Sequence, residues 1–273
     1  MLDTLTHRWL KIPYTLNVRH NQRPKKSKVT LLFIHGIGNS GAAWNDVIDK
    51  LPSDIRIITI DLLGFGESPS PKWAVYSAKT QARSVLATLL KLRITTPIIV
   101  VGHSLGSLVA IEMATRYPLI INKLILCSPP LYDDSESRLP SADNLRRQLY
   151  IAATQHPDQF LRMAAFGVKY RLVNSAFNVT AENIDSYVAT LSSMIINQTS
   201  LHDAYKLNVP TTIIKGTLDP FIVAKNFRKL SKSNSNIKVK TIIAGHEVRG
   251  SYIRPLVATI KNQLQEVSKP TKK

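Results

Sequence analysis

Short apolar runs alternate with amphipathic segments along most of the chain. Residues 98–101 are four apolar, largely β-branched residues, a pattern typical of a strand buried on both faces. Residues 104–117 follow at helix-compatible spacing and stop just before Pro118. The alternation predicts an α/β fold: a mostly parallel sheet of about eight strands with helices on both faces. We expect strands near 11–18, 28–34, 55–60, 97–101, 122–127, 210–215 and 237–243, an edge strand around 5–10, and helices near 41–51, 78–92, 104–117, 221–231 and 255–267.

Residues 129–206 break this alternation, because nothing in them resembles a strand. Thr180 suits the N-cap of one helix and Pro157 the first turn of another. A structureless loop of this length would be unusual in a compact domain. We therefore predict a core domain of residues 1–128 and 207–273 and a helical cap, or lid, inserted at 129–206. The cap side chains expected to line an apolar acyl or aromatic pocket are Phe160, Met163, Phe166, Phe177, Tyr187 and Met194.

The 273 residues are enough for one α/β domain with an insertion. Residues 2–14 contain no apolar run long enough for a signal peptide, and no stretch approaches the ~18 apolar residues needed to cross a bilayer. Cys127 is the only cysteine, so no intrachain disulfide can form, and we expect it to be buried in a strand. These features predict a cytoplasmic protein with no integral membrane segment.

The net charge of +18 is concentrated at the two ends of the chain. Residues 1–30 carry seven Lys or Arg against one acid, and residues 225–273 carry twelve against two. Such termini would allow weak contact with an anionic surface. No nucleic-acid motif accompanies the charge, so we expect no nucleic-acid partner. The sequence also lacks a metal-ligand cluster and a phosphate-binding glycine loop, which predicts neither a metal nor a cofactor.

The segment Gly102-His103-Ser104-Leu105-Gly106 lies between the strand at 97–101 and the helix at 104–117. A serine in so tight a strand-to-helix turn has a strained backbone and an exposed hydroxyl, while the glycines leave room for neighbouring backbone. Five such residues alone would also fit an ordinary loop, but the strand before them and the helix after them indicate a nucleophile elbow. Ser104 is therefore the candidate nucleophile.

A serine hydroxyl becomes a good nucleophile only when a base takes its proton. His246 is the best candidate, because it follows Gly245 at the carboxyl end of the strand predicted at 237–243. His103 lies on the elbow itself, where we expect its ring to point away from the serine's pocket, and His35 ends another strand. The remaining histidines lie in a polar N-terminal region or in the helical middle section: His7, His20, His156 and His202.

The base in turn needs a carboxylate that fixes its orientation. Asp219 follows the strand predicted at 210–215, at the edge of the sheet where ligand sites of open parallel sheets gather. Alternatively, Asp219 would cap the next helix, with Pro220 at its first position. The fallback acids are Asp133, Asp134 and Asp203, none of which follows a convincing strand.

With these residues in place, the chain resembles the α/β-hydrolase-fold serine hydrolases over about residues 10–265. The resemblance rests on His35-Gly36-Ile37-Gly38, on Asp61-Leu62-Leu63-Gly64-Phe65-Gly66-Glu67-Ser68, on the elbow, and on the pair Asp219 and His246. It implies that Ser104 is the nucleophile, His246 the general base and then acid, and Asp219 the orienting carboxylate. It also implies an oxyanion hole formed by the backbone N–H groups of Ile37 and Leu105, and a mainly structural turn at Asp61.

We therefore expect a cofactor-independent hydrolase, a monomer or homodimer, that cleaves a small carboxylic ester through an acyl-Ser104 intermediate. A carbon–carbon bond hydrolase of a vinylogous diketo acid stays open, and so do an acyltransferase and a slow or non-turnover small-molecule receptor. Haloalkane and epoxide chemistry is disfavoured, because similar enzymes use an aspartate where this chain has Ser104. For the diketo acid, the cations available to bind its carboxylate would be Arg146, Arg147, Arg162 or Arg171.

Overall fold

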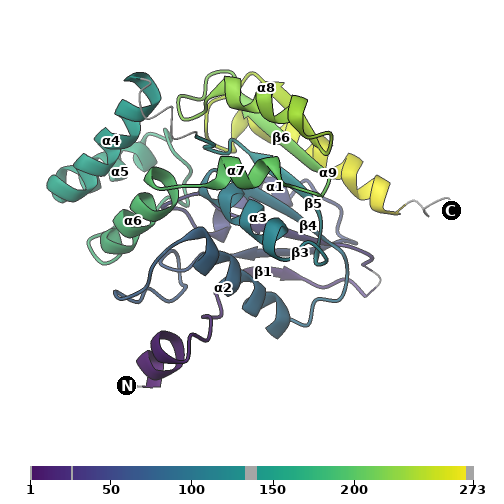
Figure 1. Ribbon diagram of the computed structural model, residues 1–273, viewed down its shortest axis with the longest axis horizontal. Helices are drawn as coiled ribbons and strands as arrows, with labels where there is room; N and C mark the ends of the chain where they lie inside the picture. The colour runs from purple at the N-terminus through teal and green to yellow at the C-terminus, as the bar shows by residue number, and fades with distance from the viewer. Residues whose placement is uncertain (1, 26, 133–139, 269–273) are drawn as a thin grey trace.

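A seven-stranded sheet forms the centre of the computed structural model, which describes residues 2–25, 27–132 and 140–268, without the side chains of 140–147 and 268. The strand order is β1-β3-β2-β4-β5-β6-β7. β1 pairs antiparallel with β3, and every other pair is parallel (Figure 1). The predicted mostly parallel sheet is confirmed, with one strand fewer than expected. The strands are β1 (Val18–Gln22), β2 (Thr30–Ile34), β3 (Arg56–Ile60), β4 (Ile98–His103), β5 (Ile121–Cys127), β6 (Thr211–Gly216) and β7 (Ile237–Ile242).

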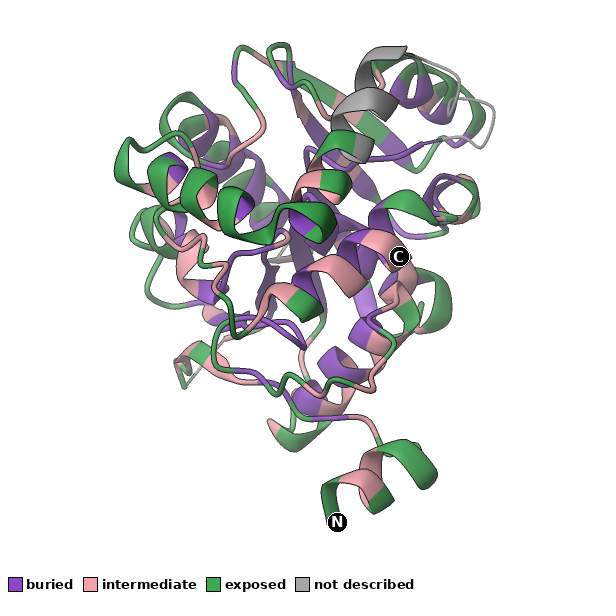
Figure 2. Ribbon diagram, turned by 90° about the vertical axis from the view of Figure 1, so that its left-hand side faces the viewer, coloured by how far each residue is buried: buried purple, intermediate pink, exposed green. Residues whose placement is uncertain are grey.

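Helices cover both faces of the sheet. In β2, Leu31 and Phe33 pack into one hydrophobic core, and Leu32 and Ile34 pack into the other, because side chains alternate across a strand. Figure 2 shows the strands buried behind helices with exposed outer faces. The α-helices are α1 (Asn45–Ile48), α2 (Ala78–Lys91), α3 (Leu105–Arg116), α4 (Pro140–Gln155), α5 (Pro157–Lys169), α6 (Ile184–Thr190), α7 (Ser200–Tyr205), α8 (Ala224–Ser233) and α9 (Ile253–Ser268).

Each core is closed by its own helices. α1 and α9 contribute to the core that holds Phe33, together with Cys127, which is buried as expected. α2, α3, α7 and α8 contribute to the core that holds Ile34. Both faces of the sheet are therefore shielded from water, and the central strands β2 and β4 consist entirely of buried residues.

The N-terminal predictions were wrong in two places. The strand expected near 11–18 begins only at Val18, because the backbone N–H of Leu16 donates to Thr88 Oγ1 (2.8 Å) and that of Asn17 to Ser68 Oγ (2.9 Å). The apolar residues Tyr14 and Leu16 are buried by direct packing rather than by pairing in the sheet. The edge strand expected around 5–10 is a short π-type helix, Thr4–Trp9, which projects from the body of the protein (Figure 1).

Residues 140–205 contain helices, with turns and loop at 170–183, and no strand. α4, α5 and α6 lie together at one end of the molecule, and a π-type turn, Leu191–Ile196, continues α6 (Figure 1). Two helix predictions need correction. The helix expected near 41–51 is a 3-10 turn, Gly41–Trp44, followed by α1, and the one expected near 221–231 starts only at Ala224. In the part of the chain described, no helix combines the length and the apolarity required to cross a bilayer.

The first turn of α3 lies directly against the ends of β2 and β4. A Cβ atom at Gly106 would lie 2.6 Å from the carbonyl oxygen of His35, and one at Gly102 would lie 2.6 Å from the carbonyl oxygen of Gly106. Both neighbours are backbone atoms, which cannot move aside as a flexible side chain can. Only glycine therefore allows this approach of helix to sheet.

We expect Gly106→Ala to lower the free energy of unfolding by about 3 kcal/mol, because the added methyl group must displace the backbone of the central strand. Urea unfolding followed by circular dichroism measures the change. Gly167→Ala in α5 is the matched control, since its Cβ would lie 3.5 Å from Val173 Cγ2, an ordinary contact. We expect that variant to gain up to about 1 kcal/mol from the better helix propensity of alanine. Equal stability of the two variants would contradict the packing argument.

Candidate active site

Ser104 lies at the junction of β4 and α3 with φ 49° and ψ −117°. A non-glycine residue with positive φ is strained, and such strain persists only where the surrounding structure enforces it. Here the backbone N–H of Ser104 donates to the carbonyl oxygen of Cys127 (2.9 Å), at the end of the neighbouring strand β5. The turn holds the hydroxyl beyond the carboxyl edge of the sheet, as the sequence predicts for a nucleophile elbow.

Two side chains from later in the chain form a line of contacts that starts at Ser104. His246 Nε2 lies 3.0 Å from Ser104 Oγ, and His246 Nδ1 lies 2.8 Å from Asp219 Oδ2. Asp219 follows β6 and His246 follows β7, so both stand at the same edge of the sheet as Ser104. The three residues therefore form one continuous chain of hydrogen bonds.

The carboxylate of Asp219 is buried, and burial by itself raises the pKa of such a group. The hydrogen bond from His246, the charge on that ring and the N–H of Phe221 (2.9 Å to Oδ1) outweigh burial, so the pKa of Asp219 lies below its ordinary value. Asp219 is therefore ionised at neutral pH. It does not cap the next helix, because α8 begins only at Ala224 with Val223 at the N-cap position.

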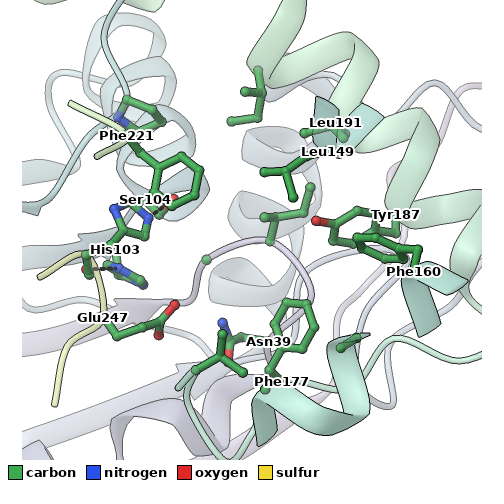
Figure 3. Close-up of a pocket in the computed structure, with 18 of the residues that line it drawn as sticks. Asn39, His103, Ser104, Leu149, Phe160, Phe177, Tyr187, Leu191, Phe221 and Glu247 are labelled. Carbon is green, nitrogen blue, oxygen red and sulfur yellow. Dashed lines mark hydrogen bonds between the residues drawn. The ribbon is translucent and has the colours of Figure 1, made fainter. Parts of the chain in front are cut away.

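The ring of His103 lies beside the site, and the expectation that it points away from the serine's pocket was wrong. His103 Nε2 lies 2.9 Å from the carbonyl oxygen of His246, and the two ring centroids are 5.1 Å apart (Figure 3). Burial lowers the pKa of His103, so the ring is neutral and its N–H donates to that carbonyl. His103 thus fixes the backbone of His246, while Asp219 fixes its ring.

His35 holds the loop that follows β2. Its ring is fully buried, Nδ1 donates to the carbonyl oxygen of Gly36 (2.7 Å), and Nε2 accepts the N–H of Leu62 (2.8 Å). Both ring nitrogens are satisfied only when the ring is neutral. Burial lowers the pKa of His35 to about 4, in agreement with this arrangement.

Asp61 joins three segments around the same edge of the sheet. The carboxylate is fully buried and accepts hydrogen bonds from the N–H of Gly41 (2.7 Å), the N–H of Glu67 (2.9 Å) and the side chains of Asn17 and Arg19. Burial by itself raises the pKa of Asp61, but the hydrogen bonds from Glu67, Asn17 and Gly41 outweigh burial, and the pKa lies below its ordinary value. The expectation of a structural turn at 61–68 agrees with this hydrogen bonding.

The loop 36–39 lies against Ser104. A Cβ at Gly36 would lie 3.3 Å from Cβ of Ser104, and the N–H of Asn39 donates to the carbonyl oxygen of Gly36 (3.2 Å). Gly38 has φ 73°, as the third position of a type II turn requires. Among the residues that the structure describes, the N–H groups of Ile37 and Leu105 have no acceptor. Two backbone donors in the segments that adjoin Ser104 are therefore unpaired.

A cavity of about 290 Å³ opens at Ser104 and extends beneath α4, α5 and α6 (Figure 3). Its walls are mostly apolar. A larger groove of about 830 Å³ shares Val173, Phe221, His246 and Glu247 with the cavity. Polar and charged residues make up a larger part of its lining than in the cavity, and we call it the polar groove, although apolar side chains also line it. The Ser104–His246 pair thus lies where an apolar chamber meets a polar groove. The chamber is lined by Leu149, Ala152, Phe160, Met163, Ala164, Val173, Phe177, Tyr187, Leu191 and Ile195 on the helical side, with Asn39, Pro130, Tyr132 and Glu247 among those nearer the sheet.

A family model described as the alpha/beta hydrolase fold matches residues 29–248, which is most of the chain. The chain belongs to this family. Its match to the "Probable lysophospholipase BODYGUARD 2" of Arabidopsis thaliana is 32% identical over 123 residues, 43% of this chain but 26% of the relative. The chain thus spans about a quarter of the length of the curated relatives it matches.

Solved structures of low sequence identity share the fold of this α/β hydrolase. A thermophilic esterase from Thermogutta terrifontis superposes with a TM-score of 0.73 at 21% identity, over 93% of this chain and 94% of that one. A meta-cleavage product hydrolase from Pseudomonas fluorescens IP01 superposes with a TM-score of 0.67 at 20% identity, over 95% and 100%. Identities this low show the common fold and leave the substrate undetermined.

Several predicted residues lie elsewhere than expected. Phe160, Met163, Phe177 and Tyr187 line the chamber, whereas Phe166 is exposed and Met194 is buried in the core. Asp203 lies on α7 and its Oδ2 accepts from Thr199 Oγ1 (3.4 Å). Asp133, Asp134 and the side chains of Arg146 and Arg147 lie outside the described part of the chain. Arg162 is exposed on α5, and Arg171 lines the polar groove.

Sequence reasoning missed many of the residues that line the chamber, among them Asn39, Tyr132, Leu149, Phe221 and Glu247. Asn39, Phe221 and Glu247 lie within two residues of Ile37, Asp219 and His246, so proximity to those residues was the available signal. Within the described residues, no three His, Cys, Asp or Glu side chains gather as metal ligands. The expectation that no cofactor takes part stays a prediction.

We expect the stability of this hydrolase to fall by up to about 3 kcal/mol as the pH drops from 6.5 to 4 through His35 alone. The pKa of His35 is depressed in the folded protein to about 4, so between these values protons bind the unfolded chain and favour unfolding. This contribution is complete above pH 6.5 and is lost as pH falls. Urea unfolding at several pH values should show a weaker acid dependence in His35→Gln than in the native protein, while His202→Gln, at an exposed position, should retain it.

Proposed function

We propose that this α/β hydrolase cleaves a small carboxylic ester through an acyl-Ser104 intermediate, without a cofactor. The observation that carries the proposal is the unbroken chain from Ser104 Oγ to His246 (3.0 Å) and from His246 to Asp219 (2.8 Å), at the wall of an apolar chamber. Ser104 is the nucleophile, His246 the general base and then acid, and Asp219 the orienting carboxylate. The match to a probable lysophospholipase agrees with ester cleavage.

Acylation follows from the orientation of the His246 ring. Because Asp219 is ionised, it accepts the N–H at Nδ1 and leaves the Nε2 lone pair directed at the Ser104 hydroxyl. Ser104 Oγ bonds to the ester carbonyl carbon while its proton passes to Nε2. Negative charge then forms on the carbonyl oxygen, where the N–H groups of Ile37 and Leu105 act as the oxyanion hole.

The intermediate collapses when its carbon–oxygen bond to the alcohol breaks and His246 donates its proton to the departing alkoxide oxygen. A water molecule then donates a proton to His246 Nε2 as its oxygen attacks the acyl carbon. Breaking the bond to Ser104 Oγ and returning the proton from His246 releases the carboxylic acid and restores the hydroxyl. No net charge leaves the site in either half of the reaction.

The chamber and the groove suit the two halves of an ester. The acyl group stays attached to Ser104 after the alcohol has left, so we place it in the apolar chamber. The alcohol must depart before water can attack, and we place it in the polar groove. In this proposal residues 129–206 act as the cap, since α4, α5 and α6 supply most of the apolar wall. The core is residues 1–128 and 207–273.

We expect Ser104→Ala to abolish turnover of p-nitrophenyl esters, and Asp219→Asn to lower kcat by about 10⁴-fold because the His246 ring loses its orientation. Initial rates on esters from acetate to palmitate measure both losses. Asp203→Asn is the control and should retain native rates.

Fluorophosphonate labelling followed by peptide mass spectrometry provides the complementary measurement. We expect one label per chain, on Ser104. Labelling of another serine, or full activity in Ser104→Ala, would refute the mechanism. Labelling without turnover of any ester would instead favour the receptor.

Glu247 favours a neutral ester over a vinylogous diketo acid. Its carboxylate faces the chamber (Figure 3), and it would repel a like charge on the substrate. Arg171 lies in the groove rather than in the chamber wall.

We therefore expect a meta-cleavage-type diketo acid to be turned over at least 100-fold less efficiently than the best p-nitrophenyl ester. Absorbance of the released dienoate measures the former, and p-nitrophenolate the latter. Faster release of the dienoate would replace ester cleavage with carbon–carbon cleavage as the proposed reaction.

A further inference from the structure

Tyr187 is a buried residue whose hydroxyl faces the chamber. Its side chain extends from α6, and only 4% of the residue is exposed. The ring packs against Phe160 (centroids 5.2 Å apart) and Phe177 (6.4 Å), which fixes its direction. Figure 3 shows the hydroxyl pointing into the cavity from the side opposite Ser104.

The Tyr187 hydroxyl has no hydrogen-bond partner among the described residues, which sets it apart from the other buried tyrosines. Each of those donates to a backbone carbonyl or to a carboxylate, as buried hydroxyls normally do. The pairs are Tyr14 with Asp3 Oδ2 (2.8 Å), Tyr76 with Pro71 O (3.0 Å), Tyr132 with Phe221 O (2.5 Å) and Tyr252 with Ile214 O (2.7 Å). A polar group left unpaired in an apolar wall needs a partner that enters the cavity.

The surroundings define the chemistry of that partner. The wall near Tyr187 includes the hydrocarbon side chains of Leu149 and Leu191 (Figure 3). Burial raises the pKa of Tyr187, so the phenol stays protonated and neutral at physiological pH. A charged group would lose its hydration there without gaining an opposite charge from the phenol, whereas an uncharged oxygen would gain a hydrogen bond.

We propose that Tyr187 is a specificity-determining residue whose hydroxyl donates to an uncharged oxygen, a keto, hydroxyl or ether group, on the acyl chain held in the chamber. The inference rests on the proposed ester hydrolysis, in which the acyl group occupies this chamber. It narrows the substrate class from small esters in general to esters of oxygenated acids. The oxygen lies along the acyl chain, away from the scissile carbonyl, because Tyr187 stands across the cavity from Ser104.

Binding tests the subsite without relying on turnover. In Ser104→Ala, isothermal titration calorimetry gives Kd for methyl 5-oxohexanoate and for methyl 5-methylhexanoate, in which a methyl group replaces the keto oxygen. We expect the keto ester to bind about 10-fold more tightly, the size of one well-formed hydrogen bond in an apolar site. The preference should disappear in the double variant Ser104→Ala, Tyr187→Phe.

Kinetics tests the same preference in the active protein. We expect kcat/KM for p-nitrophenyl 5-oxohexanoate to exceed that for p-nitrophenyl 5-methylhexanoate about 10-fold, and the ratio to fall to about 1 in Tyr187→Phe. The variant should fold normally, since it removes only an oxygen with no protein partner. Tyr170→Phe, which removes an exposed hydroxyl on the protein's surface, should keep the native ratio.

Three results separate failure of the subsite from failure of the proposed function. An unchanged keto preference in Tyr187→Phe, by binding or by kinetics, would overturn the role of Tyr187. A Tyr187-dependent preference within the pair 2-methoxyethyl and butyl hexanoate, with none in the acyl pair, would overturn the acyl assignment. Absence of fluorophosphonate labelling at Ser104 would overturn ester hydrolysis alone, and the calorimetric comparison in Ser104→Ala would still decide whether Tyr187 recognises the oxygen.

Discussion

The close approach of α3 to the ends of β2 and β4 is the constraint on which the site depends. Helix and sheet meet backbone to backbone at Gly102 and Gly106, with no room for a Cβ atom. This approach forces the chain through positive φ at Ser104 and leaves the hydroxyl at the carboxyl edge. Burial on both faces of β4 supplies the stability that maintains this strain, since a loosely packed strand would relax it. The position of Ser104 is therefore a consequence of core packing.

Two buried polar residues, His35 and Asp61, hold the surrounding loops in place by hydrogen bonds. His35 ties the loop after β2 to the backbone at Leu62, and Asp61 ties the segment after β3 to Gly41 and to β1. His35 and Asp61 thus hold the loop after β2, whose Gly36 lies against Ser104, in place although that loop contains two glycines. The hydrogen bonds of His35 require a neutral imidazole, and those of Asp61 require an ionised carboxylate. Both sets of hydrogen bonds therefore weaken in acid. The geometry at the Ser104 hydroxyl is thus coupled to pH through residues that do not touch it.

The sequence predicted best where a single physical demand determines the residue type. Strands buried on both faces require unbroken apolar runs, so β2, β4 and β5 were found close to their true bounds, and the turn at Ser104 was found from its glycines. Prediction from the sequence failed where tertiary contacts determine the structure. Tyr14 and Leu16 alternate like a strand, yet the backbone N–H groups of Leu16 and Asn17 donate to side chains of α2 and of the loop after β3. Phe166 and Phe177 are equally apolar, but only the direction of each helix and loop determines which one reaches the chamber. Periodicity carries no information on that direction.

His103 shows how a residue that looks incidental in the sequence can set the geometry of another. Hydrogen bonding of a histidine ring to one carboxylate fixes the ring's rotation but leaves the backbone beneath it free to shift. In this protein the neutral ring of His103 donates to the carbonyl oxygen of His246, while Asp219 accepts from the His246 ring. His246 is therefore held at two points, by groups that come from β4 and from the segment after β6. Because His103 is the neighbour of Ser104 in the chain, the turn that positions Ser104 also positions the backbone of His246. The 3.0 Å between Ser104 Oγ and His246 Nε2 is therefore set from both sides.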